Sequence, residues 1–178
     1  VKYDPQNIKH HLALGHAYLS GIASDTNADI AIYQKRAIRN LERATRLAPQ
    51  NPEPWLALSH AHYQMADFIQ ADQCVDQILE IDQNNYAALA MKAEIALRSN
   101  DPAKARDYAK QAAAQQPDLP AAHLIYAHAL ESLHRPQDAL QALESALPHS
   151  GTPLPLRLKR AILLKQLNGV QTAIEDLK

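Results

Sequence analysis

The chain has 178 residues, which is enough for one ordinary domain. Only four glycines and one phenylalanine occur among abundant Ala, Leu and Gln, a composition that favours helices over strands. The formal net charge of −1 argues against a general nucleic-acid or anionic-membrane binder. The single cysteine, Cys74, excludes an internal disulfide. No apolar run is long enough to span a bilayer, and no signal peptide is visible.

The first seven residues have the composition of a turn between helices. Asp4-Pro5-Gln6-Asn7 matches Ala48-Pro49-Gln50-Asn51, a turn further along the chain. We therefore interpret residues 1–7 as the tail of an upstream helical repeat, and we expect the natural protein to extend beyond Val1. A first helix is predicted over residues 8–20.

An inserted segment follows this helix. Gly15 and Ala37 are 22 residues apart, whereas the corresponding Ser59 and Ala71 are 12 apart, so the first turn carries ten extra residues. Residues 21–29 are rich in Gly, Ser, Asp and Asn and are predicted to form a loop. A tolerated insertion, which costs little closure entropy, is favoured over a partner-contacting loop.

The second helix is predicted to be lengthened and to end near Leu47. Asp25, Asn27 or Asp29 is a candidate N-cap for it, because short polar side chains accept hydrogen bonds from the first free N–H groups of a helix.

Residues 52–85 are the clearest repeat unit and are predicted to form two amphipathic helices, A and B, joined by a short turn. Small residues recur every 34 positions, where the two helices of a pair are expected to approach most closely. A fixed period of this length is typical of a helical solenoid. The small residues are Ser59, Ala93, Ala127 and Ala161 in the A helices, and Ala37, Ala71, Ala105, Ala139 and Ala173 in the B helices.

Three further units follow in phase. Residues 86–119 are predicted to turn at Asn100-Asp101-Pro102, residues 120–153 at His134-Arg135-Pro136, and residues 154–178 at Asn168-Gly169. Proline suits the first turn of a helix, where its missing N–H has no intrahelical partner anyway. The 34-residue pattern is interrupted only near residues 148–153, at the end of the fourth repeat. Because a solenoid end normally carries a polar capping helix, a further segment is expected after Lys178.

The second unit resembles the tetratricopeptide repeat pattern W-x2-L-G-x2-Y…A-x3-F…P through Trp55-x2-Leu58-Ser59 and Ala71-x3-Val75. Leu14-Gly15-x2-Tyr18 matches the first half of the pattern without substitution, whereas His62 replaces its tyrosine and Gln83 its proline. The resemblance covers nearly the whole chain. It implies an all-α, right-handed superhelical solenoid of about five helix-turn-helix repeats in one domain, residues 1–178. Its parts are residues 1–7, 8–51, 52–85, 86–119, 120–153 and the partial repeat 154–178.

In this family the A helices line a concave groove, so the resemblance implies that these helices bind a partner segment. Carried over residue by residue, the candidate groove residues are Leu12, His16, Leu56, His60, Tyr63, Met91, Glu94, Leu97, Arg98, Leu124, His128 and Glu131. Domains that clamp chaperone carboxyl-terminal peptides use Lys and Asn at some of these positions. Leu12, His16 and Ala57 stand there instead, so co-chaperone activity is disfavoured.

Neither catalysis nor metal binding is predicted. His16, His60 and His128 recur at one groove position, and we interpret them as solvated side chains. No two of the nine histidines are three or four residues apart, so no helix presents a ligand pair on one face. The sequence contains no Gly-rich phosphate loop, no HExxH and no cysteine pair. We therefore expect no enzyme and no cofactor.

Two charged stripes are predicted on the B helices. We interpret them as surface ion pairing between neighbouring helices rather than as a binding site. The basic stripe is Arg36, Arg39, Arg43 and Arg46, and the acidic stripe is Asp72, Asp76 and Glu80.

The leading functional hypothesis is a non-catalytic scaffold that binds another protein or a peptide in its groove. One alternative is the substrate-positioning arm of a larger bacterial glycosyl- or sulfotransferase. Another is a periplasmic assembly factor of the cytochrome c maturation kind, so both the bacterial cytoplasm and the periplasm remain open. Self-association is also expected through an uncovered solenoid end. The apolar residues expected there are Leu163, Leu167, Ile174 and Leu177.

Overall fold

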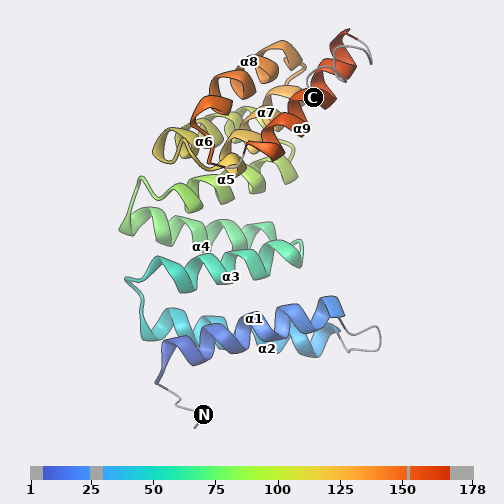
Figure 1. Cartoon of the computed structure of the whole chain (residues 1–178). Coiled ribbons are helices and arrows are strands. Elements are labelled where there is room, and N and C mark those ends of the chain that lie inside the picture. The colour runs from blue at the N-terminus through green and yellow to red at the C-terminus, as the bar shows by residue number, and fades with distance from the viewer. Residues whose placement is uncertain (1–5, 25–29, 152, 169–178) are drawn as a thin grey trace. The chain divides into compact units, whose positions relative to one another are not determined.

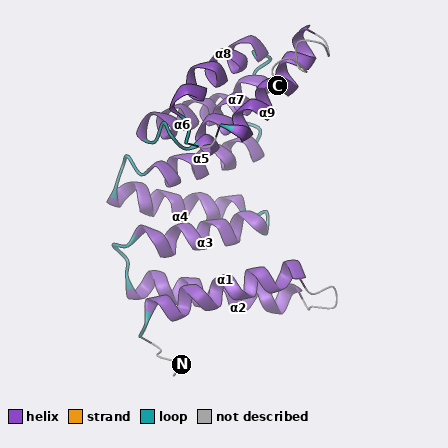
Figure 2. Cartoon of the chain, viewed as in Figure 1, coloured by secondary structure: helices purple, strands orange, loops and turns teal. Residues whose placement is uncertain are grey.

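A computed structural model of the chain describes residues 6–24, 30–151 and 153–168, and every regular element in these ranges is helical (Figures 1 and 2). The chain divides into two compact units, Val1–Gln83 and Asn84–Lys178. None of the helices in the described ranges is long and apolar enough to cross a membrane.

The first unit contains two helix pairs. Helix α1 (Ile8–Ser24) packs against α2 (Ile30–Leu47), and α3 (Pro52–Gln64) packs against α4 (Phe68–Ile81). Helix α2 also contacts α3, which joins the pairs. The buried core draws on all four helices, so the pairs share one hydrophobic centre. Its residues are Leu12, Leu41, Ala44, Ala57, Leu58, Ala61 and Cys74.

The described part of the second unit, residues 84–151 and 153–168, contains two helix pairs and a further helix. Helix α5 (Tyr86–Arg98) packs against α6 (Pro102–Gln115), and α7 (Pro120–Ser132) packs against α8 (Pro136–Ala146). A short 3-10 helix (Leu147–His149) then leads to α9 (Leu154–Asn168), which contacts both α7 and α8. A core cluster of this unit consists of Ala127, Leu130, Ala139, Leu143, Ala146, Leu156 and Leu163.

Three of the turns within helix pairs share one backbone conformation. Ala66, Asn100 and His134 have φ of 59°, 58° and 57°, in the left-handed region. The next N–H then donates to a carbonyl five residues earlier, which satisfies an otherwise free group at the end of the A helix. The turns predicted at Asn100-Asp101-Pro102 and His134-Arg135-Pro136 are thereby confirmed. The bonds are Asp67 N to His62 O at 2.9 Å, Asp101 N to Ala96 O at 2.8 Å, and Arg135 N to Leu130 O at 2.9 Å.

The periodic small residues lie where the A and B helices meet, as predicted. Ser59 is fully buried, and its Oγ donates a hydrogen bond of 2.9 Å to the carbonyl oxygen of Ala71 on the paired helix. A larger side chain at either position would force the two backbones apart. Ala173 lies outside the described residues. Also buried are Ala37, Ala93, Ala105, Ala127, Ala139 and Ala161.

The predicted loop 21–29 begins too early. Helix α1 continues through Ser24, so residues 21–24 are helical rather than loop. A single glycine costs a helix only about 1 kcal/mol relative to alanine, and Ile22-Ala23 continues it. Helix α2 ends at Leu47, as predicted. The candidate N-caps at 25, 27 and 29 lie outside the described residues.

The irregular end of the fourth repeat is tied to the turn before α7. After the 3-10 helix, Gly151 N donates a hydrogen bond of 3.0 Å to the carbonyl oxygen of Asp118. This bond links the end of the fourth repeat to the inter-repeat turn before α7.

The predicted exposure of Leu163 is wrong. Leu163 is fully buried in the core cluster of the second unit, because it points back toward α7 and α8. Leu167 is half-buried, and Ile174 and Leu177 lie outside the described residues. The apolar residues that α9 does expose are Leu154, Leu158 and Ile162.

Candidate functional site

The A helices of the second unit, α5, α7 and α9, are neighbours, and each carries predicted groove positions. We call the exposed and half-buried groove residues of these three helices the A-helix face. On α5, Arg98 is exposed, whereas Glu94 and Leu97 are half-buried. On α7, His128 is exposed and Leu124 is half-buried. This part of the face therefore offers apolar, acidic and basic groups.

An ion pair joins α7 to α9. Lys159 Nζ lies 2.5 Å from Glu131 Oε2, and the two side chains are only 24% and 18% exposed. Screening by water is weaker at a half-buried pair than at the surface, so the contact is stronger than an exposed pair. It links the two A helices.

Helix α9 exposes an apolar stripe one repeat after Leu124 and His128. Leu158 is 48% exposed and Ile162 is 51% exposed, one helical turn apart. Arg157 and Lys165 are exposed on the same helix. The stripe is therefore apolar with cationic flanks.

The predicted groove residues on the A helices of the first unit, α1 and α3, differ in their exposure. His16 and His60 are exposed, whereas Leu56 is half-buried. The Tyr63 ring packs edge-on against Phe68, with centroids 5.5 Å apart and planes at 62°. Tyr63 therefore has a fixed orientation and presents only part of its ring.

Two predicted groove residues do not line an accessible surface, so the prediction is wrong for them. Leu12 is 6% exposed and belongs to the core cluster of the first unit. Met91 is 2% exposed, since its flexible apolar chain fills interior space. Both are structural residues.

The groove histidines are not arranged as a metal site. Within the described ranges, no group of three His, Cys, Asp or Glu side chains could hold a metal ion.

The basic stripe of α2 makes contacts within the first unit. The Arg36 guanidinium carbon lies 5.8 Å from the centroid of the Tyr18 ring, within cation–π range. Arg46 Nη1 lies 3.7 Å from Glu42 Oε2 of the same helix. Surface contacts of this kind contribute little to stability.

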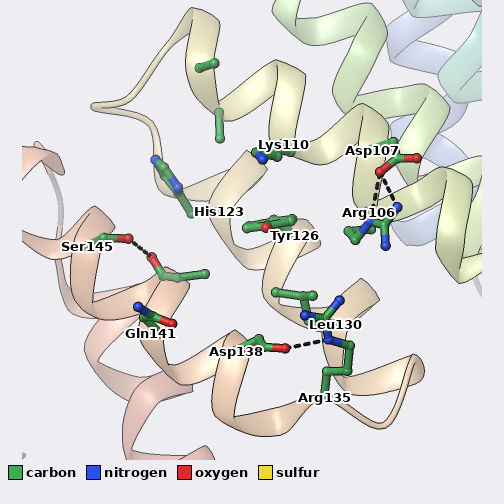
Figure 3. Close-up of a pocket in the computed structure, with 13 residues that line it drawn as sticks. Arg106, Asp107, Lys110, His123, Tyr126, Leu130, Arg135, Asp138, Gln141 and Ser145 are labelled. Carbon is green, nitrogen blue, oxygen red and sulfur yellow. Dashed lines mark hydrogen bonds and ion pairs between the residues drawn. The ribbon is translucent and has the colours of Figure 1, made fainter.

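A feature that sequence analysis missed is a hollow of about 710 Å³ between α6, α7 and α8 (Figure 3). Its sequence signal is a group of alanines in α6. Ala113 and Ala114, which line the hollow, stand 34 residues after Leu79 and Glu80 of α4. A corresponding hollow of about 510 Å³ lies between α2, α3 and α4 and is lined by Trp55, His62, Asp76 and Glu80 among others.

The helix pairs, their 34-residue period and their small contact residues define a helical-repeat protein. The tetratricopeptide repeat family matches residues 35–95. The family described as anaphase-promoting complex, cyclosome, subunit 3 matches residues 70–146. The chain is a tetratricopeptide repeat protein. No curated protein matches it.

Solved structures of tetratricopeptide proteins have the same fold. MamA 41-end from Desulfovibrio magneticus RS-1 is 16% identical, with a TM-score of 0.66 over 92% of this chain and 91% of that one. TTC0263, a thermophilic TPR protein in Thermus thermophilus, is 17% identical, with a TM-score of 0.73 over 96% of this chain and 88% of that one. YrrB, described as a TPR protein with an unusual peptide-binding site, is 12% identical, with a TM-score of 0.63 over 97% of this chain and 84% of that one.

Proposed function

We propose that this protein is a non-catalytic scaffold that binds a segment of another protein on its A-helix face. The observation that carries the proposal is the contrast between the two sides of α9. Leu156 and Leu163 are fully buried, whereas Leu158 and Ile162 remain about half exposed. Exposed apolar side chains that are grouped on one helix face are typical of a protein-binding surface.

The chemistry of this face favours an amphipathic segment. Two apolar side chains one turn apart fit anchor residues of a helical or extended peptide. Covering the exposed half of each would contribute about 1 kcal/mol, because full burial of such a side chain contributes about 1.5–3 kcal/mol. His128 on α7 and the Glu131–Lys159 pair supply polar groups beside these anchors.

The similar proteins support the class of partner. The peptide-binding site named for YrrB belongs to a protein with the same fold. By analogy, we assign a peptide or protein segment, rather than a small metabolite, as the ligand of this face.

The proposal can be tested by site-specific photo-crosslinking. The photoreactive residue benzoylphenylalanine replaces His128 on the A-helix face, or Gln111 on the exposed side of α6 as a control. We expect the His128 derivative to crosslink one discrete protein in extracts of the source cells, and the Gln111 derivative to leave that protein free. Crosslinking from Gln111 alone would contradict the proposal.

A further inference from the structure

The hollow between α6, α7 and α8 lies entirely within the second unit, and it is lined by residues of B helices as well as by α7. We call it the α6–α8 hollow. Figure 3 shows side chains from all three helices around it. It is lined by Arg106, Asp107, Lys110, Ala113, Ala114, His123, Tyr126, Leu130, Arg135, Asp138, Gln141, Ala142 and Ser145.

Short side chains on α6 contribute to the space in the hollow. Ala113 corresponds to Leu79 of α4, and Ala114 corresponds to Glu80. The space that a larger residue would fill is left open above Leu130, which is buried in the floor. At about 710 Å³, the hollow lies within the volume range of ligand pockets in proteins.

The charges around the hollow do not cancel. Arg106 Nη2 lies 2.6 Å from Asp107 Oδ1, and Arg135 Nε lies 2.5 Å from Asp138 Oδ2. Each arginine is thus neutralised by a neighbouring carboxylate. Lys110 has no ion-pair partner among the described residues, so the lining carries one uncompensated positive charge.

Polar groups of α7 lie beside this cation. Lys110 of α6 and His123 and Tyr126 of α7 all line the hollow (Figure 3). His123 Nε2 donates a 3.0 Å hydrogen bond to the carbonyl oxygen of Pro117, which fixes the ring in the wall. The Tyr126 hydroxyl makes no hydrogen bond within the described residues and is available to a ligand.

We propose that the α6–α8 hollow is a second docking site, which takes an acidic side chain of a partner protein together with a neighbouring apolar one. The carboxylate pairs with Lys110 and accepts a hydrogen bond from Tyr126, and the apolar side chain fills the space above Ala113 and Leu130. This site goes beyond the A-helix face, because its lining comes from the B helices α6 and α8 and from residues of α7 that are not groove positions.

A single uncompensated cation selects this occupant over a nucleic acid. Binding to a phosphate backbone needs several cations that neutralise successive phosphates, whereas this lining offers one unpaired cation beside two arginines that are already paired with carboxylates. A single carboxylate of a partner protein, by contrast, needs only one cation, which Lys110 supplies.

The test is a selection from random peptides displayed on phage, run in parallel against the full chain and its Ala113→Leu variant. Leucine is the residue that α4 carries at the corresponding position, so the helix pair accommodates it while the hollow is filled. Circular dichroism of the variant must match that of the unchanged chain. We expect a population of peptides that only the unchanged chain retains, with acidic residues next to large apolar ones.

Affinities of synthetic versions of these peptides then locate the site. We expect Lys110→Glu to weaken binding at least about tenfold, since a charge-assisted contact becomes a repulsive one, and Tyr126→Phe to weaken it about threefold. Lys35→Glu makes the same charge change on α2 and is expected to leave the affinity unaltered.

Three results would overturn the proposal. The first is that no peptide distinguishes the unchanged chain from Ala113→Leu. The second is that the distinguishing peptides are neutral or basic. The third is that Lys110→Glu and Lys35→Glu weaken binding equally, which would indicate a general electrostatic effect.

Discussion

Trp55 and His123 make the same hydrogen bond at corresponding positions of two repeats. Trp55 Nε1 donates to the carbonyl oxygen of Pro49 at 2.9 Å, and His123 Nε2 donates to that of Pro117 at 3.0 Å. In each case the ring ties the first turn of an A helix to the preceding inter-repeat turn. Because a carbonyl oxygen only accepts, His123 must carry a proton on Nε2.

Replacing His123 by Trp should therefore preserve stability, whereas replacing it by Phe should not. Both substitutions introduce a large aromatic ring, but only Trp keeps an N–H donor. We expect His123→Phe to lower the free energy of unfolding by about 0.5–1.5 kcal/mol relative to His123→Trp, as measured by urea denaturation. Equal stabilities of the two variants would show that the hydrogen bond is immaterial.

Gly15 is required by its contact with Leu41. A Cβ at position 15 would lie 2.6 Å from Leu41 Cδ2 and Cγ, and Leu41 is fully buried. Overpacking costs about 1–3 kcal/mol, which outweighs the gain of about 1 kcal/mol in helix propensity. We expect Gly15→Ala to lower the free energy of unfolding by about 1 kcal/mol in urea denaturation.

The matched test of this contact is a double-mutant cycle with Leu41→Ala. This change removes both Leu41 Cγ and Cδ2, which the added methyl group would meet, so Gly15→Ala should cost less in that background. Strict additivity of the two changes would contradict the proposed clash.

Most of the fold could be predicted from the sequence because the repeat period fixes several elements at once. The small residues at Ser59 and Ala71 identify both helices of a pair and the face on which they meet. The end of α1 could not be predicted in the same way. Residues 21–24 lie in an insertion without a counterpart in the other repeats, so loop composition was the only guide.

The candidate surface was less predictable, because family positions do not determine burial. Leu12 and Met91 occupy groove positions but are buried. Leu158 and Ile162 occupy equivalent positions and are exposed. The α6–α8 hollow depends on side chains that are missing rather than present. Alanines are also common in helices that border no hollow. The sequence alone therefore does not distinguish a helix beside a hollow from an ordinary helix.

Cys74 should react slowly with alkylating reagents in the folded protein. Burial, together with the nearby carboxylates of Asp67 and Glu42, raises the pKa of its thiol from 9.0 to about 11. Only the thiolate is nucleophilic, so at about pH 8 the rate with iodoacetamide should be about 100-fold lower than in urea. Equal rates would contradict the burial of the thiol.

The same shift predicts how stability depends on pH. Below pH 9.0 the thiol is protonated in both states and its contribution is fully present. As the pH rises from 9.0 to about 11, the unfolded chain loses this proton first, and the free energy of unfolding falls. Cys74→Ala should lack this component of the decline.

Self-association through α9 should strengthen with salt. Two copies that meet through Leu154, Leu158 and Ile162 would bring the exposed cations Arg157 and Lys165 close together. Salt screens this repulsion, so sedimentation should show more dimer at about 1 M than at about 0.05 M NaCl. Dimers that dissociate at high salt would point to an interface held by opposite charges instead.

The most direct test of the A-helix face is calorimetric titration of the crosslinked partner, once purified, against two double variants. Leu158→Ser with Ile162→Ser removes apolar anchors from α9. Ile32→Ser with Ile69→Ser makes the same kind of change at exposed positions of the B helices α2 and α4. We predict that the α9 variant binds at least about tenfold more weakly and that the B-helix variant binds as the unchanged chain does. Loss of affinity in the B-helix variant alone would contradict the account.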